Sequence, residues 1–380
     1  MTHYMTRTIH PVGHGAFYTE IFDNGFTAVY DCGSHSSILS NSCRHIENTV
    51  KGIHHIDLMF LSHFHSDHVN RFLYILKANI PIERLLIPYY SWEEKLILIG
   101  GLSLHDRDSL EIAGLISSPR LFITRTFATT GIRVSAVVEN GFEGPFSEED
   151  YSDLIQSGQS IRVITNRSHL QNKEEAEWIY IPFNLKSNAF KVNAENFYRH
   201  LVGVYPKFAS PIQITNAKDL EDIRREYLAF FKKGLNETSM QVLSTPKSPE
   251  GFLACDSNCH LSTCGPNCAT QILRYASCLY TGDFQIKNYS NIELDGIYNA
   301  LQQYNLGMIQ VPHHCSKTSF VRDFWDKIRS INTNIISFIS HGYKYSHPYQ
   351  PLVSLLQSRG FKVVEVTDKS PGLKVDVIRI

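Results

Sequence analysis

Residues 56–68 read Ile-Asp-Leu-Met-Phe-Leu-Ser-His-Phe-His-Ser-Asp-His. The apolar part, 56–61, has the length and composition of a buried strand. Three imidazoles and a carboxylate then fall within six residues. A strand that turns directly into a helix can aim all four at one point. Zinc accepts imidazole nitrogen and carboxylate oxygen, and imidazole also suits iron and manganese. The stretch therefore predicts a metal site made by His63, His65, Asp67 and His68 rather than a polar loop rich in histidine.

The pattern His-x-His-x-Asp-His at 63–68 resembles the signature of the metallo-β-lactamase fold, a superfamily of mostly dinuclear metallohydrolases. The resemblance implies an α/β protein, the metallo-β-lactamase αββα sandwich, with residues 1–380 as a single domain. An Asn-Gly turn at 24–25 predicts a hairpin that ends in Asp31-Cys32-Gly33. In the family such an aspartate usually braces the metal-site loop, and we expect this of Asp31.

The bulk composition is that of an ordinary folded protein. Hydrophobic residues make up 43% of the 380 and charged residues 19%. The formal net charge is −1, so contact with nucleic acid would need a local basic patch. No apolar run approaches the ~18–20 residues that span a bilayer, and the N-terminus lacks the layout of a secretion signal. We expect a cytoplasmic protein that does not contact a membrane.

More ligand types follow later predicted strands. Asp283 comes at the end of a strand closing in Thr-Gly-Asp, and in the superfamily a Gly-Asp there supplies a bridging carboxylate. The pair His313 and His314 ends another strand and resembles a His-His-Gly-Ser element of the competence-protein branch, with Cys in place of Gly. His347, followed by Pro, matches the family's final ligand position, and His341 is a weaker candidate. The competence-protein branch, the hydrolase domain of DNA-uptake channels, is the part of the family that the chain resembles most.

The resemblance implies two divalent cations. The ligands of one would be His63, His65 and either His313 or His314. The ligands of the other would be Asp67, His68 and His347, with Asp283 bridging the two ions. The non-ligating histidine of the pair, with Lys317, could steady a phosphate or protonate a leaving oxygen, or both could merely support the site or face solvent. The candidates for a direct catalytic part are Asp67, His313, His314 and Lys317.

Two cations about 3.5–4 Å apart can share a hydroxide and lower its pKa, which suits phosphodiester hydrolysis. The predicted function is therefore a metal-dependent phosphodiesterase or nuclease, with zinc the first expectation for the ions and manganese the second. Its substrate would be a phosphodiester, which includes nucleic acid. One alternative is a metallohydrolase of thioesters, lactones or amides. Another is a metal-stabilised interaction module, favoured if the metal has no open coordination position.

Two segments fall outside the resemblance. Residues 89–234 are predicted to be an insertion that borders the active site, where substrate choice or protein partners would be determined. Residues 250–269 are predicted to be a cysteine-rich hairpin insertion. Its thiols could hold a structural zinc, although Cys-x3-Cys spacing is less diagnostic than Cys-x2-Cys, and reduced thiols or a redox pair are alternatives. These thiols are Cys255, Cys259, Cys264 and Cys268. Between the two segments, Asn236 stands where many family members have a histidine ligand, or is a simple turn residue.

Overall fold

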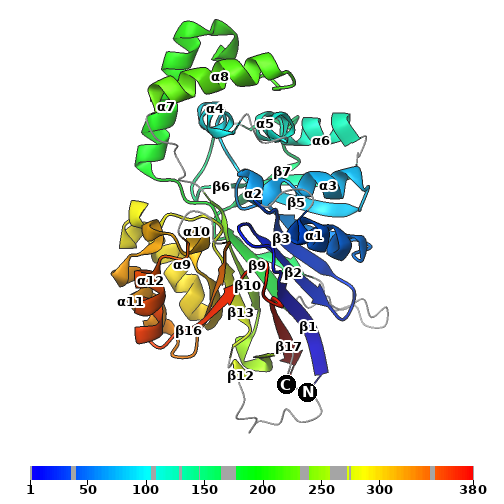
Figure 1. Cartoon of the computed structure of the whole chain (residues 1–380), viewed down its shortest axis with the longest axis vertical. Coiled ribbons are helices and arrows are strands. Elements are labelled where there is room, and N and C mark those ends of the chain that lie inside the picture. The colour runs from blue at the N-terminus through cyan, green and yellow to red at the C-terminus, as the bar shows by residue number, and fades with distance from the viewer. Residues whose placement is uncertain are drawn as a thin grey trace.

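Two β-sheets face each other, with helices on their outer surfaces (Figure 1). The computed structural model describes residues 2–35, 40–103, 108–127, 131–144, 146–163, 177–231, 239–256, 272–273, 275–342 and 347–379. Within these ranges, α9 (Asn291–Gln303), α11 (Arg322–Ile331) and α12 (Gln350–Ser358) cover one sheet. The other sheet is covered by α1 (Asn41–Lys51), α2 (Ser66–Val69) and α3 (Phe72–Lys77), and helices of the 89–234 region pack against α2 and α3. The predicted αββα sandwich is therefore confirmed.

The first sheet has ten strands in the order β12-β11-β17-β1-β2-β3-β4-β5-β6-β7. Their bounds are β12 (Ile272–Leu273), β11 (Phe252–Asp256), β17 (Leu373–Arg379), β1 (Thr2–Ile9), β2 (Phe17–Phe22), β3 (Thr27–Cys32), β4 (Ile56–Phe60), β5 (Ile82–Pro88), β6 (Arg133–Val138) and β7 (Asp153–Gln156). The predicted hairpin is confirmed, because β2 and β3 pair antiparallel across the turn at Asp23-Asn24-Gly25. From β3 to β7 the strands run parallel, so their carboxyl ends meet at one edge.

The second sheet has seven strands in the order β16-β15-β14-β13-β10-β9-β8. Their bounds are β16 (Lys362–Val366), β15 (Ile336–Ser340), β14 (Leu306–Gln310), β13 (Ser277–Tyr280), β10 (Gln241–Pro246), β9 (Trp178–Phe183) and β8 (Ile161–Val163). Strands β13 to β16 are parallel, and residues of the predicted site follow the ends of β13, β14 and β15. The parallel parts of the two sheets therefore present their carboxyl ends to a shared region.

The 89–234 region contributes to both sheets. It supplies β6 and β7 to the first sheet and β8 and β9 to the second. Its helices are α4 (Trp92–Gly101), α5 (Ser109–Ser117), α6 (Pro119–Phe127), α7 (Asn188–Val204) and α8 (Ala217–Phe230). They gather beyond the carboxyl edge of the first sheet, at the top of Figure 1, where α4 packs on α7 and α8. The segment is thus part of both sheets of the sandwich, and its helices extend the molecule beyond them.

A buried ion pair joins the sheets. Arg7 of β1 donates to Glu20 of β2 over 2.6 Å, and both side chains are almost wholly buried. The Glu20 carboxylate also accepts hydrogen bonds from Tyr180, Ser244 and Tyr280, which belong to the opposite sheet. Since a buried charge is stable only when paired and hydrogen-bonded, this network fixes how the two sheets face each other.

Apolar residues at helical spacing from Asp67 to Lys77 predict one continuous helix after the histidine motif, but the structure has two. Helix α2 ends at Val69, and α3 begins at Phe72. The backbone N–H of Arg71 donates to the carbonyl of Cys32 instead of continuing the helix. The Asn70 amide donates to and accepts from the backbone of Ser34. Both polar side chains are buried, and Arg71 pairs with Glu47 of α1 at 3.3 Å.

The cysteine-rich segment is described only at its base. Strand β11 pairs antiparallel with β12, and the Cys255 side chain on β11 is buried. Cys259, Cys264 and Cys268 lie outside the described residues, as does Asn236, so the structural zinc stays a prediction. Among the described helices, none combines the length and the apolar character that a membrane crossing requires.

Candidate metal centre

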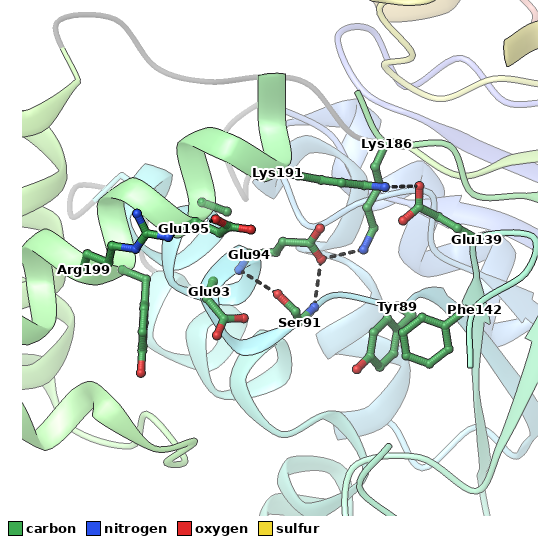
Figure 2. Close-up of a pocket in the computed structure, with 12 residues that line it drawn as sticks. Tyr89, Ser91, Glu93, Glu94, Glu139, Phe142, Lys186, Lys191, Glu195 and Arg199 are labelled. Carbon is green, nitrogen blue, oxygen red and sulfur yellow. Dashed lines mark hydrogen bonds and ion pairs between the residues drawn. The ribbon is translucent and has the colours of Figure 1, made fainter. Parts of the chain in front are cut away.

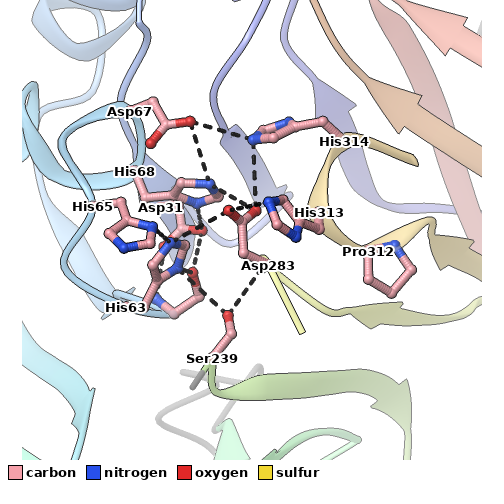
Figure 3. Close-up of polar contacts among 12 residues, drawn as sticks. Asp31, His63, His65, Asp67, His68, Ser239, Asp283, Pro312, His313 and His314 are labelled. Carbon is pink, nitrogen blue, oxygen red and sulfur yellow. Dashed lines mark hydrogen bonds and ion pairs between the residues drawn. The ribbon is translucent and has the colours of Figure 1, made fainter. Parts of the chain in front are cut away.

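Asp31, at the end of β3, holds in place the loop of residues 61–65 that begins the histidine motif, called the motif loop below. One carboxylate oxygen of Asp31 accepts the backbone N–H of Ser62 at 2.7 Å, and the other accepts the Ser62 hydroxyl and the Nδ1–H of His68, both at 2.7 Å (Figure 3). Asp31 is fully buried and has φ +54°, in the left-handed region that Asp and Asn tolerate better than most residues. The expectation that Asp31 braces the loop is confirmed. Its hydrogen bond leaves Nε2 of His68 facing the centre.

Asp283 lies at the middle of the cluster. Its Oδ1 is 3.2 Å from Nε2 of His68 and 3.5 Å from Nε2 of His314. Its Oδ2 is 3.7 Å from Nε2 of His63 and 3.8 Å from Nε2 of His313. The preceding Gly282 has φ +53°, and a Cβ there would overlap the hydroxyls of Ser62 and Ser239. A glycine is therefore required to bring this carboxylate so close to the motif loop.

The paired histidines stand on strained backbone. His313, His314 and Cys315 have φ of +51°, +51° and +62°, in α10 (Pro312–Cys315), although none is glycine. Such residues cost about 1–3 kcal/mol each and cluster at functional sites. The Nδ1–H of His314 donates to the Ser340 carbonyl at 2.8 Å, so its buried Nε2 points to Asp67 at 3.3 Å. His313 is less buried, and Figure 3 shows its ring beside Asp283.

Two groups of donor atoms result, each with its atoms within 4.8 Å of one another. One consists of His63, His68 and Asp283, and the other of His14, Asp67 and His314. His14 is not among the residues predicted from the sequence. A signal was present, since a histidine between two glycines lies in the loop that follows the first strand.

The other predicted site residues lie at varying distances from these groups. Nδ1 of His65 is 3.0 Å from Nε2 of His63. The ring of His347 is 6.1 Å from that of His313 and 6.5 Å from that of His314. Lys317 is exposed in the short helix η4 (Lys317–Ser319). The remaining candidate, His341, lies 3.0 Å from Glu365 on β16 and belongs to neither group.

The donor set fits divalent cations. Among the described residues, Nε2 of His68, Oδ1 of Asp283 and Nε2 of His314 are buried atoms with no hydrogen-bond partner, although they face one another. Buried polar atoms are normally hydrogen-bonded, so three of them meeting at one point fit the binding of a divalent cation. Four-coordinate zinc holds its ligands at about 2.0–2.2 Å, which places them about 3.3–3.6 Å from each other. The separations of 3.2–3.7 Å between Asp283 and its neighbours His63, His68 and His314 agree with this spacing.

The charges in the cluster shift several pKa values. Burial alone would raise the pKa of Asp283, but His313, His68 and His314 hold it well below its usual range. Burial would likewise raise the pKa of Asp67, and His68 and His314 more than offset this. Burial lowers the pKa of His63 well below its ordinary value, and the neighbouring imidazoles add to the effect. These two carboxylates and this imidazole are therefore in the deprotonated form that metal ligation requires.

A cavity of about 620 Å³ lies between α4 and α7 (Figure 2). Its wall includes the ion pairs Lys186–Glu94 and Lys191–Glu139, and the rings of Tyr89 and Phe142 in contact. Phe64, inside the histidine motif, packs on Tyr90 with ring centroids 6.1 Å apart. The Lys186 ammonium lies 5.1 Å from the ring of Tyr90. Side chains thus connect the motif loop to a cavity large enough for a small molecule.

No protein-family model and no curated protein matches the chain. Solved structures similar to it include the following three. An isothiocyanate hydrolase from Delia radicum gut bacteria has a TM-score of 0.39 and 10% identity, and the match covers 99% of each chain. A long-form RNase Z from yeast has a TM-score of 0.35 and 11% identity, covering 89% of this chain and 36% of the other. YhfI from Bacillus subtilis, a metallo-β-lactamase fold protein, has a TM-score of 0.29 and 10% identity, covering 89% of this chain and 98% of YhfI. Similarity this distant does not bear on the activity of the chain.

Proposed function

We propose that this protein is a metal-dependent hydrolase that holds two divalent cations, zinc in the first place and manganese as the alternative. The observation that supports it most strongly is the pair of three-residue donor groups, His63–His68–Asp283 and His14–Asp67–His314, which lie side by side. Asp283 contacts members of both groups, since its Oδ1 is 3.2 Å from His68 and 3.5 Å from His314. It is therefore the residue best placed to touch two ions at once.

Within this proposal, His314 is the ligand of the histidine pair and His313 faces the substrate. His314 is fully enclosed, and its hydrogen bond to the Ser340 carbonyl fixes the tautomer whose Nε2 is free to ligate. His313 is half-buried, and Nδ1 of His313 is 3.3 Å from the Thr318 hydroxyl. His65, 3.0 Å from His63, completes the ligand set of the ion beside His63.

When bound, two adjacent divalent ions lower the pKa of a water molecule and stabilise the charge that develops on phosphoryl oxygens, which suits a phosphodiester. The side chains of the protein orient the ligands and handle the protons. Asp31 and Ser340 orient His68 and His314 through their Nδ1 atoms. Burial lowers the pKa of His313, so its imidazole is neutral at pH 7 and can accept a proton from a reacting group as a general base.

We further propose that the cavity between α4 and α7 receives the part of the substrate that does not react. Its charged side chains include Lys186, Lys191 and Arg199 against Glu93, Glu94, Glu139 and Glu195. Because the carboxylates are in excess and three of them are paired with the cations, the cavity suits an uncharged or aromatic group better than a string of phosphates. A small phosphodiester with an aromatic substituent fits this distribution better than long nucleic acid.

The test is hydrolysis of bis-(p-nitrophenyl) phosphate and of DNA by the metal-loaded full chain, beside a panel of thioesters, lactones and amides. We expect phosphodiester cleavage that falls at least about 100-fold in Asp283→Asn. A matched control is Asp222→Asn, a buried aspartate on α8 paired with lysine and arginine, which should keep its activity. Cleavage confined to thioesters, lactones or amides would favour the second kind of hydrolase. Stoichiometric metal with no cleavage of any compound would favour the interaction module.

A further inference from the structure

We infer that His14, on the loop between β1 and β2, is a ligand of the ion beside Asp67 and His314. This inference rests on the proposed metal centre and adds to it a residue outside the histidine motif. It also removes His347 from the position that the sequence motif assigns to it. The ligand set of this ion would then combine the N-terminal hairpin, the motif helix and the end of β14.

The distances support this assignment. Nε2 of His14 lies 3.7 Å from Oδ2 of Asp67, which is itself 3.3 Å from Nε2 of His314. Both separations are near the ~3.3–3.6 Å that two ligands of one tetrahedral zinc ion keep between them. The ring centroids of His14 and His314 are 4.0 Å apart. The three side chains come from three separate elements and converge on one point.

The loop is shaped to bring His14 to this point. Its flanking residues Gly13 and Gly15 have φ of +70° and +149°, which side-chain-bearing residues rarely adopt. A Cβ on Gly15 would lie 2.5 Å from the carbonyl oxygen of Gly33 and 2.8 Å from that of Asp67. The glycine therefore allows the loop to lie directly against the backbone that carries a ligand.

Hydrogen bonds then fix the loop. The N–H of Ala16 donates to the Asp67 carbonyl at 3.3 Å, and the N–H of His35 donates to the His14 carbonyl at 2.7 Å. The Ser34 hydroxyl donates to the Val12 carbonyl at 2.8 Å. Asp67, which would bind the same ion as His14, and residues 34–35 after β3 thus position the loop that carries His14.

His347 is farther from this ion. Its ring lies parallel to that of His14, with centroids 5.7 Å apart, and 6.5 Å from the ring of His314. His14 is therefore the nearer of the two to His314, and His347 belongs to neither donor group. On this assignment, His347 lies at the rim of the site, beside His14 and His313.

Cobalt substitution of the full chain tests the inference without an activity assay. In His14→Cys, a thiolate bound to Co²⁺ should add an intense near-ultraviolet charge-transfer band. The band is read as the difference from cobalt-loaded wild type, because the chain has eight cysteines. His347→Cys is the matched control and should add no band. A band in His347→Cys but not in His14→Cys, or in neither variant, would overturn the assignment.

A second measurement covers the case in which cysteine packs poorly. Competition with a chelator should show that His14→Gln binds its second cobalt equivalent at least about tenfold more weakly than wild type, with the first unchanged. His347→Gln should keep both affinities. If wild type binds two ions and His14→Gln binds both equally well, this inference fails and the metal centre stands. If wild type binds none, the metal centre itself fails.

Discussion

Replacing Asp31 by Asn should weaken metal binding although Asp31 is not a proposed ligand. The carboxylate accepts three hydrogen bonds, from the backbone N–H and hydroxyl of Ser62 and from Nδ1 of His68. An asparagine has nearly the same shape and tolerates the left-handed conformation that Asp31 adopts at φ +54°. The backbone should therefore keep its course, and the change should act mainly through hydrogen-bond chemistry.

The asparagine amide cannot accept hydrogen bonds from both His68 and the Ser62 N–H as the Asp31 carboxylate does. If its NH2 group faces His68, Nδ1 must become the acceptor, and the proton moves to Nε2, where it blocks ligation. If instead its oxygen faces His68, the NH2 group meets the N–H of Ser62 and one buried donor is left unpaired. A hydrogen bond to a charged group contributes about 1.5–3 kcal/mol, so we expect the dissociation constant of the metal to rise about 10- to 100-fold.

The assay is competition between the protein and a chromogenic chelator for zinc, with the affinity of Asp31→Asn compared to wild type. Asp222→Asn is the control, because it makes the same change at a buried aspartate whose partners are Lys207, Lys218 and Arg225. It should reduce thermal stability and leave zinc affinity unchanged. Zinc affinity of Asp31→Asn within about twofold of wild type would refute the role given to the Asp31–His68 hydrogen bond.

Three further outcomes are expected. Arg7→Met should lower the free energy of unfolding by about 3–5 kcal/mol in urea titrations, because it leaves Glu20 charged and unpaired between the sheets. The double variant Arg7→Met, Glu20→Gln should lose less stability than Arg7→Met alone, and equal losses would contradict this explanation. Burial lowers the pKa of His10 to about 3, so on going from pH 7 to pH 5 the unfolded state gains a proton that the folded state does not. Wild type should lose about 2 kcal/mol more stability over that range than His10→Gln, and parallel pH profiles would exclude this contribution. In the cavity, Phe142→Ala should raise KM about tenfold for an aromatic phosphodiester and change kcat less than twofold, whereas an unchanged KM would place the substrate elsewhere.

Much of the sandwich and of the site was predictable because the signals are local. The apolar run before His63 marks a buried strand, and the Asn-Gly turn marks the hairpin that ends at Asp31. Asp283 and His314 could be found because each follows a short apolar strand directly. Parallel strands bring such ends to one edge, so residues far apart in sequence meet there.

What the sequence could not reveal depends on tertiary contacts. The helix after the motif breaks because the N–H of Arg71 finds the carbonyl of Cys32, a partner fixed only when β3 and β4 pair. The position of His14 depends on close backbone approach at Gly15 and Gly33, a tertiary contact that the two glycines beside His14 do not specify by themselves. The 89–234 region supplies strands to both sheets because β6 and β9 pair with distant strands, β5 and β10.

The central claim is that this chain gathers its histidines and aspartates around two divalent ions. Elemental analysis of the purified full chain, after incubation with zinc and removal of free metal, tests that claim most directly. The proposed metal centre predicts about two zinc ions per wild-type chain and a loss of at least one in folded Asp283→Ala. A folded wild-type chain that retains no zinc, or an Asp283→Ala variant that retains the full amount, would contradict it.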